Sequence, residues 1–219
     1  MEPFVHLKGV AAPLPIDNVD TDAIIPSRET QSVSRSGYGE KLFANWRYLP
    51  GTREINADFV LNRAPFAQAQ LLVGGRNFGC GSSREAAVWA LSQFGIRCVI
   101  APSFGTIFRN NCIRNGLLPV TLPIKVVEPL LSDLQACVGE AIVAIDLQAC
   151  TVTGPDGAVH RFEIGALDRE MLLSGADEIA ITLQKRGLIE AFRNMDRTQR
   201  PWVYQDSQIW AEDTRETGT

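Results

Sequence analysis

The sequence predicts an α/β fold with a mixed, partly parallel sheet and flanking helices. Between residues 69 and 122, short apolar runs alternate with amphipathic segments, which is typical of parallel strands joined by helices. Around the turn at residues 154–157, shorter apolar runs indicate an antiparallel hairpin. The chain has 219 residues, of which 45% are hydrophobic and 21% are charged, and this composition suits one globular domain.

The N-terminal part has one clear strand and a long irregular connection. Residues 4–10 are expected to form the first strand, and Pro13 and Pro15 are expected to end it. Residues 18–50 show no clear periodicity, so we expect a functional loop or a flexible lid there.

The middle of the chain alternates strands and helices. Apolar residues recur with helical spacing from Ala87 to Phe94, and Gly95 provides a C-terminal stop. Further helices are expected at residues 103–115 and 127–137. Strands are expected at residues 58–61, 70–73, 97–101 and 118–122.

The C-terminal part is expected to add antiparallel strands and two short helices. The expected strands cover residues 141–147, 149–153 and 158–164, and the expected helices cover residues 167–174 and 177–194. Residues 205–219 are polar and aperiodic, which is typical of a frayed end. We therefore expect a single domain at residues 1–205 and a flexible tail at residues 206–219.

Composition and charge argue against several functional classes. The net charge of −4 gives no electrostatic basis for binding nucleic acid or an anionic membrane surface. No apolar run is long enough to cross a bilayer, and the first residues do not resemble a secretion signal. We expect a cytoplasmic protein whose partners include neither nucleic acid nor a membrane.

The five cysteines form no recognisable framework for disulfides or metal. They are odd in number and widely spaced, and only two histidines accompany them, so we expect no cofactor bound by this chain itself. Cys98 and Cys112 are expected to be small buried hydrophobes. Cys80 lies close to an expected helix start, which lowers a thiol pKa, but few bases are available to make it a nucleophile.

The most informative segment is the glycine loop, residues 74–85, which reads Gly-Gly-Arg-Asn-Phe-Gly-Cys-Gly-Ser-Ser-Arg-Glu. It follows an expected strand and precedes an expected helix. Because a helix N-terminus carries unpaired N–H donors and a partial positive charge, this loop is a candidate site for an anion or a developing alkoxide.

Three interpretations compete for residues 82–85. The first is a capping box, with Ser82 as N-cap and Glu85 three residues later. The second is a phosphate-binding loop, but neither the P-loop pattern nor the dinucleotide-binding pattern is present. The third is a catalytic hydroxyl, with the alkoxide of a serine stabilised by backbone N–H groups and by Arg84. From the residues alone, the capping box ranks first.

Several further motifs accompany the glycine loop. Residues 18–26 read Asn-Val-Asp-Thr-Asp-Ala-Ile-Ile-Pro. Other characteristic segments are residues 37–43, 46–48, 99–104, 110–112, 115–119, 177–180 and 182–183. Together these motifs resemble the small-subunit family of 3-isopropylmalate dehydratase, the counterpart of the swivelling C-terminal domain of aconitases. The resemblance covers residues 4–192 and implies a swivelling β/β/α-type domain.

The resemblance implies roles for particular residues. Ser82 would be the base that moves the substrate's proton. The backbone around Ser83 and Arg84 would hold the alkoxide, and the planar fork of Arg84 would pair with a substrate carboxylate. Asp22 would face the same cleft, and its neighbouring acidic residues lack the spacing of a calcium loop.

The resemblance also implies a hydro-lyase of leucine biosynthesis that interconverts 2-isopropylmalate and 3-isopropylmalate. The chain would be active only with a large subunit, in a heterodimer or heterotetramer. A [4Fe-4S] cluster in that subunit would act as a Lewis acid on the small hydroxy-diacid substrate.

Two positions differ from the family's usual pattern. Ala86 stands where a histidine usually follows Glu85. Glu29 and Thr30 stand where an aromatic–leucine pair helps to select the substrate's side group. Arg28 is expected to be a substrate-binding residue. A charged Glu29 beside Arg28 either suits a smaller or more polar hydroxy-diacid or points to solvent, and the general rarity of buried charges favours solvent. A paralogous subunit for another hydroxy-diacid and a diverged, non-catalytic binding subunit therefore stay open as alternatives.

Overall fold

The computed structural model describes residues 1–30, 36–136 and 141–204. It contains two compact units, Met1–Ala176 and Asp177–Thr219, which are described separately. The expectation of a single domain over residues 1–205 stays a prediction, and the expected tail at residues 206–219 lies outside the described residues.

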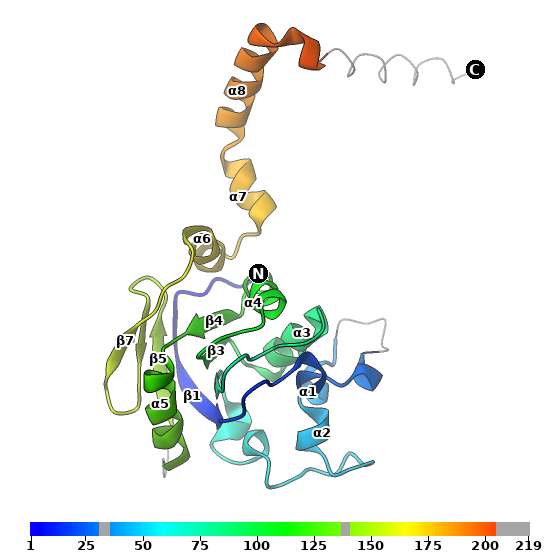
Figure 1. The fold of residues 1–219 in the computed structure, drawn as a ribbon, viewed down its shortest axis with the longest axis vertical. Helices are drawn as coiled ribbons and strands as arrows, with labels where there is room; N and C mark the ends of the chain where they lie inside the picture. The colour runs from blue at the N-terminus through cyan, green and yellow to red at the C-terminus, as the bar shows by residue number, and fades with distance from the viewer. Residues whose placement is uncertain (31–35, 137–140, 205–219) are drawn as a thin grey trace, which may run out of the picture. The chain divides into compact units, whose positions relative to one another are not determined.

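Within the described residues, the first unit is built on a seven-stranded sheet with the order β4-β3-β2-β1-β5-β6-β7 (Figure 1). Strands β1 to β4 pair in parallel, whereas β1, β5, β6 and β7 pair antiparallel. The predicted α/β fold with a mixed sheet is therefore confirmed. The strands are β1 (His6–Leu14), β2 (Leu71–Gly74), β3 (Cys98–Ala101), β4 (Leu118–Thr121), β5 (Ile142–Asp146), β6 (Thr151–Thr153) and β7 (Val159–Arg161).

Strand β1 is longer than expected, because it continues through Pro13 to Leu14. Its first half, from His6 to Val10, pairs with β5, and its second half pairs with β2. Pro13 thus lies where β1 has a ladder partner on one side only, a position at which the missing proline N–H is tolerated. The prediction that Pro13 ends this strand was wrong, whereas the strand does end directly before Pro15.

Helices cover both faces of the sheet. Helix α5 packs on β1, β2 and β3, and α3 packs with α1 and α4 (Figure 1). The helices of this unit are α1 (Thr21–Ile24), α2 (Ala44–Arg47), α3 (Glu85–Phe94), α4 (Thr106–Arg114), α5 (Ile124–Ala136) and α6 (Ala166–Ser174). Short 3₁₀ helices are η1 (Ser27–Glu29), η2 (Gly39–Lys41), η3 (Val60–Asn62) and η4 (Phe66–Gln68). The segment 18–50 therefore holds short helices, and its residues 31–35 lie outside the described part.

Residues 58–61 do not form the expected strand, because side chains satisfy the backbone locally. The amide N–H of Asp58 donates to Asn56 Oδ1 at 3.1 Å. Asn62 Nδ2 donates to the carbonyls of Asn56 at 2.9 Å and of Arg47 at 2.7 Å. These bonds fold the segment back on α2 and leave η3 in place of a strand.

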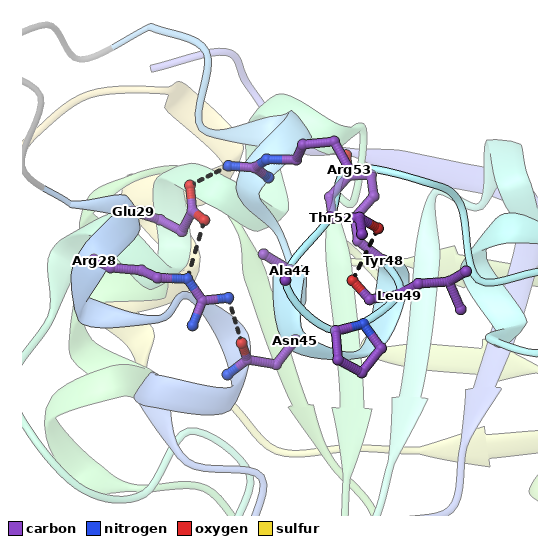
Figure 2. A pocket seen from close by; sticks show the side chains of 10 residues that line it. Arg28, Glu29, Ala44, Asn45, Tyr48, Leu49, Thr52 and Arg53 are labelled. Carbon is purple, nitrogen blue, oxygen red and sulfur yellow. Dashed lines mark hydrogen bonds and ion pairs between the residues drawn. The ribbon is translucent and has the colours of Figure 1, made fainter.

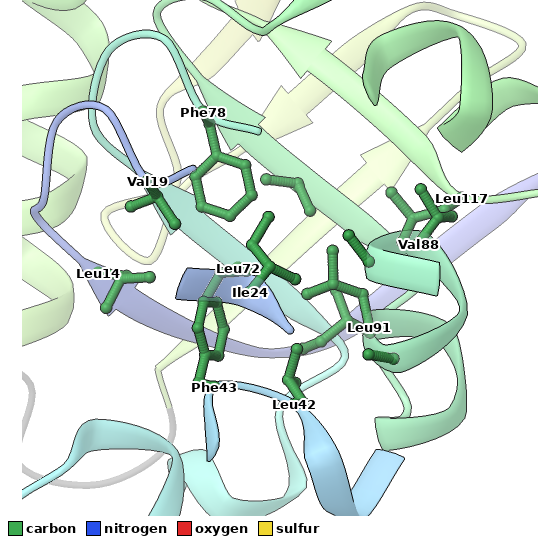
Figure 3. Packing of buried hydrophobic residues seen from close by; sticks show 14 of the residues in the cluster. Leu14, Val19, Ile24, Leu42, Phe43, Leu72, Phe78, Val88, Leu91 and Leu117 are labelled. Carbon is green, nitrogen blue, oxygen red and sulfur yellow. The ribbon is translucent and has the colours of Figure 1, made fainter. Parts of the chain in front are cut away.

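A buried apolar cluster lies between the sheet and α3. Leu72 of β2, Leu91 of α3 and Phe78 of the glycine loop are fully buried in it (Figure 3). Phe43 is also fully buried, and its ring stacks on Trp46 at a centroid distance of 5.3 Å. Because Phe78 belongs to this cluster, the glycine loop is anchored in the core.

Up to Tyr204, where the description ends, the second unit contains helices α7 (Glu178–Gln184) and α8 (Arg186–Gln199), followed by η5 (Pro201–Tyr204). The single helix expected at 177–194 is therefore broken at Lys185. Asp177 caps α7, since its Oδ1 accepts from the N–H of Ala180 at 2.7 Å. Asp196 accepts from Tyr204 Oη at 2.7 Å, which folds η5 back on α8. Among the described residues, no helix has the length and apolar character needed to cross a membrane.

Candidate active site

The glycine loop begins where β2 ends, at the carboxyl edge of the parallel strands. The N–H of Arg76 donates to Asp17 Oδ1 at 2.6 Å, and the N–H of Gly79 donates to the carbonyl of Val19 at 2.7 Å. On the other side, the N–H of Phe78 donates to the carbonyl of Ser103, which follows β3, at 3.0 Å. The loop is thus held by the segments that follow both neighbouring strands.

Two glycines give this loop its path. Gly79 and Gly81 both have positive φ, at +71° and +88°, which L side chains rarely adopt. Gly79 also lies against the buried ring of Phe108, and a Cβ at this position would stand 2.1 Å from Phe108 Cγ. The requirement for glycine at residue 79 is therefore both conformational and steric.

The predicted capping box is wrong. Helix α3 begins at Glu85, its N-cap residue is Arg84, and no side chain caps it. The Glu85 carboxylate instead accepts from Asn115 Nδ2 at 3.0 Å. Ser82 and Ser83 precede the helix and are exposed, so their hydroxyls lie at the surface beside the start of α3.

Thr21 joins the second motif to the glycine loop. Its side chain is buried, and Oγ1 donates to the carbonyl of Ser82 at 3.0 Å. Its backbone N–H donates to the carbonyl of Cys80 at 2.9 Å. Sequence reasoning missed this role, although Thr21 stands between the two aspartates of the motif. The two bonds fix the backbone immediately before Ser83.

Asp22 and Arg84 form the charged centre of the site. Arg84 Nη1 lies 2.5 Å from Asp22 Oδ1, and the same oxygen accepts from Ser27 Oγ at 2.9 Å. Arg84 Nη1 also lies 3.4 Å from the carbonyl of Ile25. The hydrogen bond from Arg84, assisted by that from Ser27, holds the pKa of Asp22 below its usual range. The structure therefore brings together Asp22, Ser27 and Arg84 beside Ser82 and Ser83.

Arg28 is directed elsewhere, into a pocket of about 790 Å³ between η1 and the segment that follows α2 (Figure 2). Its Nη2 donates to Asn45 Oδ1 at 2.5 Å. Within the described residues, the structure does not bring its side chain to the Asp22–Arg84 pair. The expected grouping of Arg28 with the other substrate-binding residues stays a prediction.

Glu29 does not point to solvent, and the interpretation that favoured solvent was wrong. Its side chain is only 11% exposed, and its Oε2 lies 2.6 Å from Arg53 Nη2. Its other oxygen lies 3.5 Å from Arg28 Nε. Two arginines compensate the charge, which explains why the carboxylate tolerates this degree of burial. Arg53 lies 24 residues further along the chain and carried no sequence signal for this contact.

The cysteines in the described part of the chain are free thiols. Cys98 and Cys112 are fully buried, and burial raises the pKa of both thiols. Cys80 is half-buried in the glycine loop, whereas Cys137 lies outside the described residues. In the parts of the chain that the structure describes, no three His, Cys, Asp or Glu side chains are grouped as metal ligands.

Known proteins similar to this chain agree on one family. A sequence profile described as "Aconitase C-terminal domain" matches residues 1–125, and a profile described as LeuD_N matches residues 128–166. A 3-isopropylmalate dehydratase small subunit from Cupriavidus necator is 54% identical over 94% of this chain and 100% of its own length. The corresponding protein from Paramagnetospirillum magneticum is 49% identical over 93% of this chain and 100% of its own length.

A solved structure supports the same assignment. The crystal structure of 3-isopropylmalate dehydratase (leuD) from Methanocaldococcus jannaschii superimposes with a TM-score of 0.59 and 31% sequence identity. The match covers 86% of this chain and 99% of that chain.

Proposed function

The chain belongs to the family of 3-isopropylmalate dehydratase small subunits, and we propose that its glycine loop provides the base and the carboxylate clamp of that enzyme. The family's activity is that of a hydro-lyase of leucine biosynthesis, which interconverts 2-isopropylmalate and 3-isopropylmalate by dehydration and rehydration. The observation that carries the proposal is the convergence of Asp22, Arg84 and the exposed Ser82 at the start of α3.

Ser82 is the proposed base. Its hydroxyl is exposed, while its own carbonyl is held by Thr21, so the residue is fixed by its backbone and not by its side chain. As an alkoxide, Ser82 would remove the proton from the carbon next to a substrate carboxylate during dehydration and return it during hydration. The N–H groups of Ser83 and Arg84, at the positive end of α3, would lower the free energy of that alkoxide.

Arg84 is the proposed carboxylate clamp. Both contacts of its guanidinium within the described residues use Nη1, one with Asp22 and one with Ile25. The remaining N–H groups form an edge suited to a bidentate contact with a carboxylate. Asp22 therefore orients the guanidinium and leaves its outer edge for the substrate.

The rest of the active site is proposed to lie in a large partner subunit. That subunit would carry a [4Fe-4S] cluster, which supplies Lewis-acid chemistry to the substrate's hydroxyl and carboxylate when it is bound. This chain would contribute the proton transfer and the recognition of the second carboxylate. The complex is proposed to be a heterodimer or heterotetramer in the cytoplasm.

The decisive experiment combines this chain with its iron–sulfur large subunit and measures the hydration of isopropylmaleate. We expect Ser82→Ala to lower kcat by about 10²–10⁴-fold, the usual contribution of a general base. Ser83→Ala is the matched control, and it should retain most of the activity because only its backbone N–H is used. A Ser82→Ala complex as fast as the wild type would refute the base assignment.

The same assay tests the two alternatives that the sequence left open. A diverged, non-catalytic subunit would give no turnover in the wild-type complex. A subunit for a different hydroxy-diacid would turn over citraconate-like diacids and not isopropylmaleate.

A further inference from the structure

A charge cluster around one largely buried carboxylate adjoins the proposed site, and neither the base nor the clamp explains it. The cluster consists of Glu29, Arg53, Arg28 and Asn45, which line one pocket and are linked in series by hydrogen bonds and ion pairs (Figure 2). Its centre is Glu29, whose side chain is 11% exposed and lies 2.6 Å from Arg53. A carboxylate buried to this degree between two cations requires a structural or functional reason.

The backbone of Glu29 is held as tightly as its side chain. Its carbonyl accepts from Lys41 Nζ at 2.9 Å, and its N–H donates to the carbonyl of Pro26 at 2.8 Å. The residue closes η1, the single turn that begins at Ser27. Fixing Glu29 at one end therefore fixes the position of Ser27 at the other.

Ser27 connects this turn to the charged centre. Its Oγ donates to Asp22 Oδ1 at 2.9 Å, and that same oxygen receives Arg84 Nη1 at 2.5 Å. The carbonyl of Ser27 accepts from Thr30 Oγ1 at 2.7 Å, which completes the turn. Arg53 is thus connected to Glu29 by an ion pair, Glu29 to Ser27 by the backbone of η1, and Ser27 to the Asp22–Arg84 pair by a hydrogen bond.

We propose that Glu29 and Arg53 are positioning residues of the site: their ion pair locks η1, so that Ser27 holds Asp22 and Asp22 orients the Arg84 guanidinium toward the substrate carboxylate. This inference rests on the proposed role of Arg84 as carboxylate clamp. Neither residue touches the Asp22–Arg84 pair, so their effect is on substrate binding and not on proton transfer.

Glu29 forms a second ion pair, with Arg28. Arg28 Nε lies 3.5 Å from Glu29 Oε1 while its Nη2 donates to Asn45 of α2. The hydrogen bond from Arg53 to Glu29 also raises the pKa of Arg53 above its ordinary value. Arg28 therefore ties η1 to α2, and Glu29 ties it to the segment that contains Arg53.

The first test is steady-state kinetics of the complex with saturating large subunit. Glu29→Gln and Arg53→Met should each raise KM for isopropylmaleate about tenfold and change kcat less than about twofold, because a misoriented clamp weakens binding of ground state and transition state alike. Arg53→Lys keeps the charge and should recover most of the lost affinity. The double variant should be no worse than either single variant, since both remove the same ion pair.

The matched control is Glu54→Gln. Glu54 is exposed and follows Arg53 directly, so the variant makes the same chemical change beside the same turn. It should leave KM unchanged. An unchanged KM in Glu29→Gln, or additive effects in the double variant, would overturn the proposal. Ser82→Ala in the same assay tests the base independently.

The second test needs no activity and uses this chain alone. The pKa of the Asp22 carboxyl, followed by carbon-13 NMR, should rise toward its ordinary value in Glu29→Gln, because the loosened turn withdraws Ser27 and Arg84 from it. Glu54→Gln should leave that pKa unchanged. An identical Asp22 pKa in wild type and Glu29→Gln would contradict the proposed positioning role of Glu29. This result would not depend on whether the proposed role of Arg84 in catalysis is correct.

Discussion

The Arg84 guanidinium contacts the Asp22 carboxylate at 2.5 Å, although 62 positions separate the two residues in the chain. Asp22 lies in α1, next to the segment that leaves β1, and Arg84 is the N-cap residue of α3. The pair therefore joins the connections that follow two neighbouring strands, β1 and β2. Ser82, with its exposed side chain, lies two residues before Arg84.

Replacement of Arg84 should lower kcat/KM, and the decrease should be larger when both the charge and the planar fork of the guanidinium are removed than when the fork alone is removed. Arg84→Ala should lower kcat/KM by about 100-fold or more, or about 3 kcal/mol, since a charged partner of the substrate disappears. Arg84→Lys should lie between this variant and the wild type, because a lysine keeps the charge but not the planar fork. The measurement is steady-state kinetics of the reconstituted complex.

Arg97→Lys is the control for that series. Arg97 lies just before β3, at the end of the strand away from the glycine loop, and pairs with Glu2 at 2.8 Å. Wild-type kinetics are expected for this variant. Equal losses in Arg84→Lys and Arg97→Lys would mean that the effect arises from general destabilisation.

The Asp22–Arg84 pair should stabilise the fold only above acidic pH. Its hydrogen bonds, chiefly that from Arg84, lower the pKa of Asp22 below 3.8 in the folded chain. The stabilisation is therefore fully present above about pH 4 and disappears as the pH falls through the folded-state pKa. Since the Asp22 side chain is 52% exposed, solvent screening limits the effect to about 1 kcal/mol or less.

Comparison with Asp22→Asn isolates this contribution. The free energy of unfolding of the two proteins should differ at about pH 6 and converge as the pH falls through the folded-state pKa of Asp22, because the carboxyl is then protonated in both folded and unfolded wild type. If the difference in the free energy of unfolding grew as the pH fell, the predicted pH dependence of the Asp22–Arg84 pair would be wrong.

Ser82→Ala should leave the stability of the chain unchanged, whatever it does to turnover. A serine N-cap contributes about 1 kcal/mol, but Ser82 caps no helix here. Asp20 is the proper comparison, because its Oδ1 caps α1 by accepting from the N–H of Ala23 at 2.6 Å. Chemical denaturation should show a loss of about 1 kcal/mol for Asp20→Ala. An equal loss of stability in Ser82→Ala would support the capping-box interpretation that the structure contradicts.

Two glycines with similar φ allow the conformational and steric costs to be separated. Gly79→Ala combines φ of +71° with a contact of 2.1 Å to Phe108, so we expect a loss of about 3 kcal/mol or more. Gly157→Ala has φ of +80° but meets no described atom within 4 Å, so only the conformational cost of about 1 kcal/mol should appear. Equal losses in the free energy of unfolding of the two variants, measured by denaturant titration, would contradict the predicted clash with Phe108.

Much of the sheet could be predicted from the sequence because its signals are local. The apolar runs that became β2, β3 and β4 alternate with helical patterns, and the Gly154–Gly157 turn marked the β6–β7 hairpin. The start of α3 was mispredicted because two residues far away in sequence hold this segment, one by donating to the Ser82 carbonyl and the other by donating to the Glu85 carboxylate. Those partners, Thr21 and Asn115, cannot be inferred from the spacing of a capping box.

The candidate site was predictable only in part from the sequence. The resemblance of the two motifs singled out Asp22 and Arg84, and the structure places them in contact. Ser27 and Arg53 were missed because a serine in a loop and an arginine in a turn are ordinary surface residues in sequence. Their importance depends on contacts that only the fold creates.

The position of β1 in the sheet has a consequence for folding during synthesis. This strand is made early in synthesis, yet its antiparallel partner β5 ends at Asp146, far later in the chain. Half of β1 therefore stays unpaired on a nascent polypeptide until most of the first unit has left the ribosome. Contacts between such distant segments make folding slow and expose apolar strands meanwhile. Shortened chains that end before β5 should consequently depend on chaperones to stay out of aggregates.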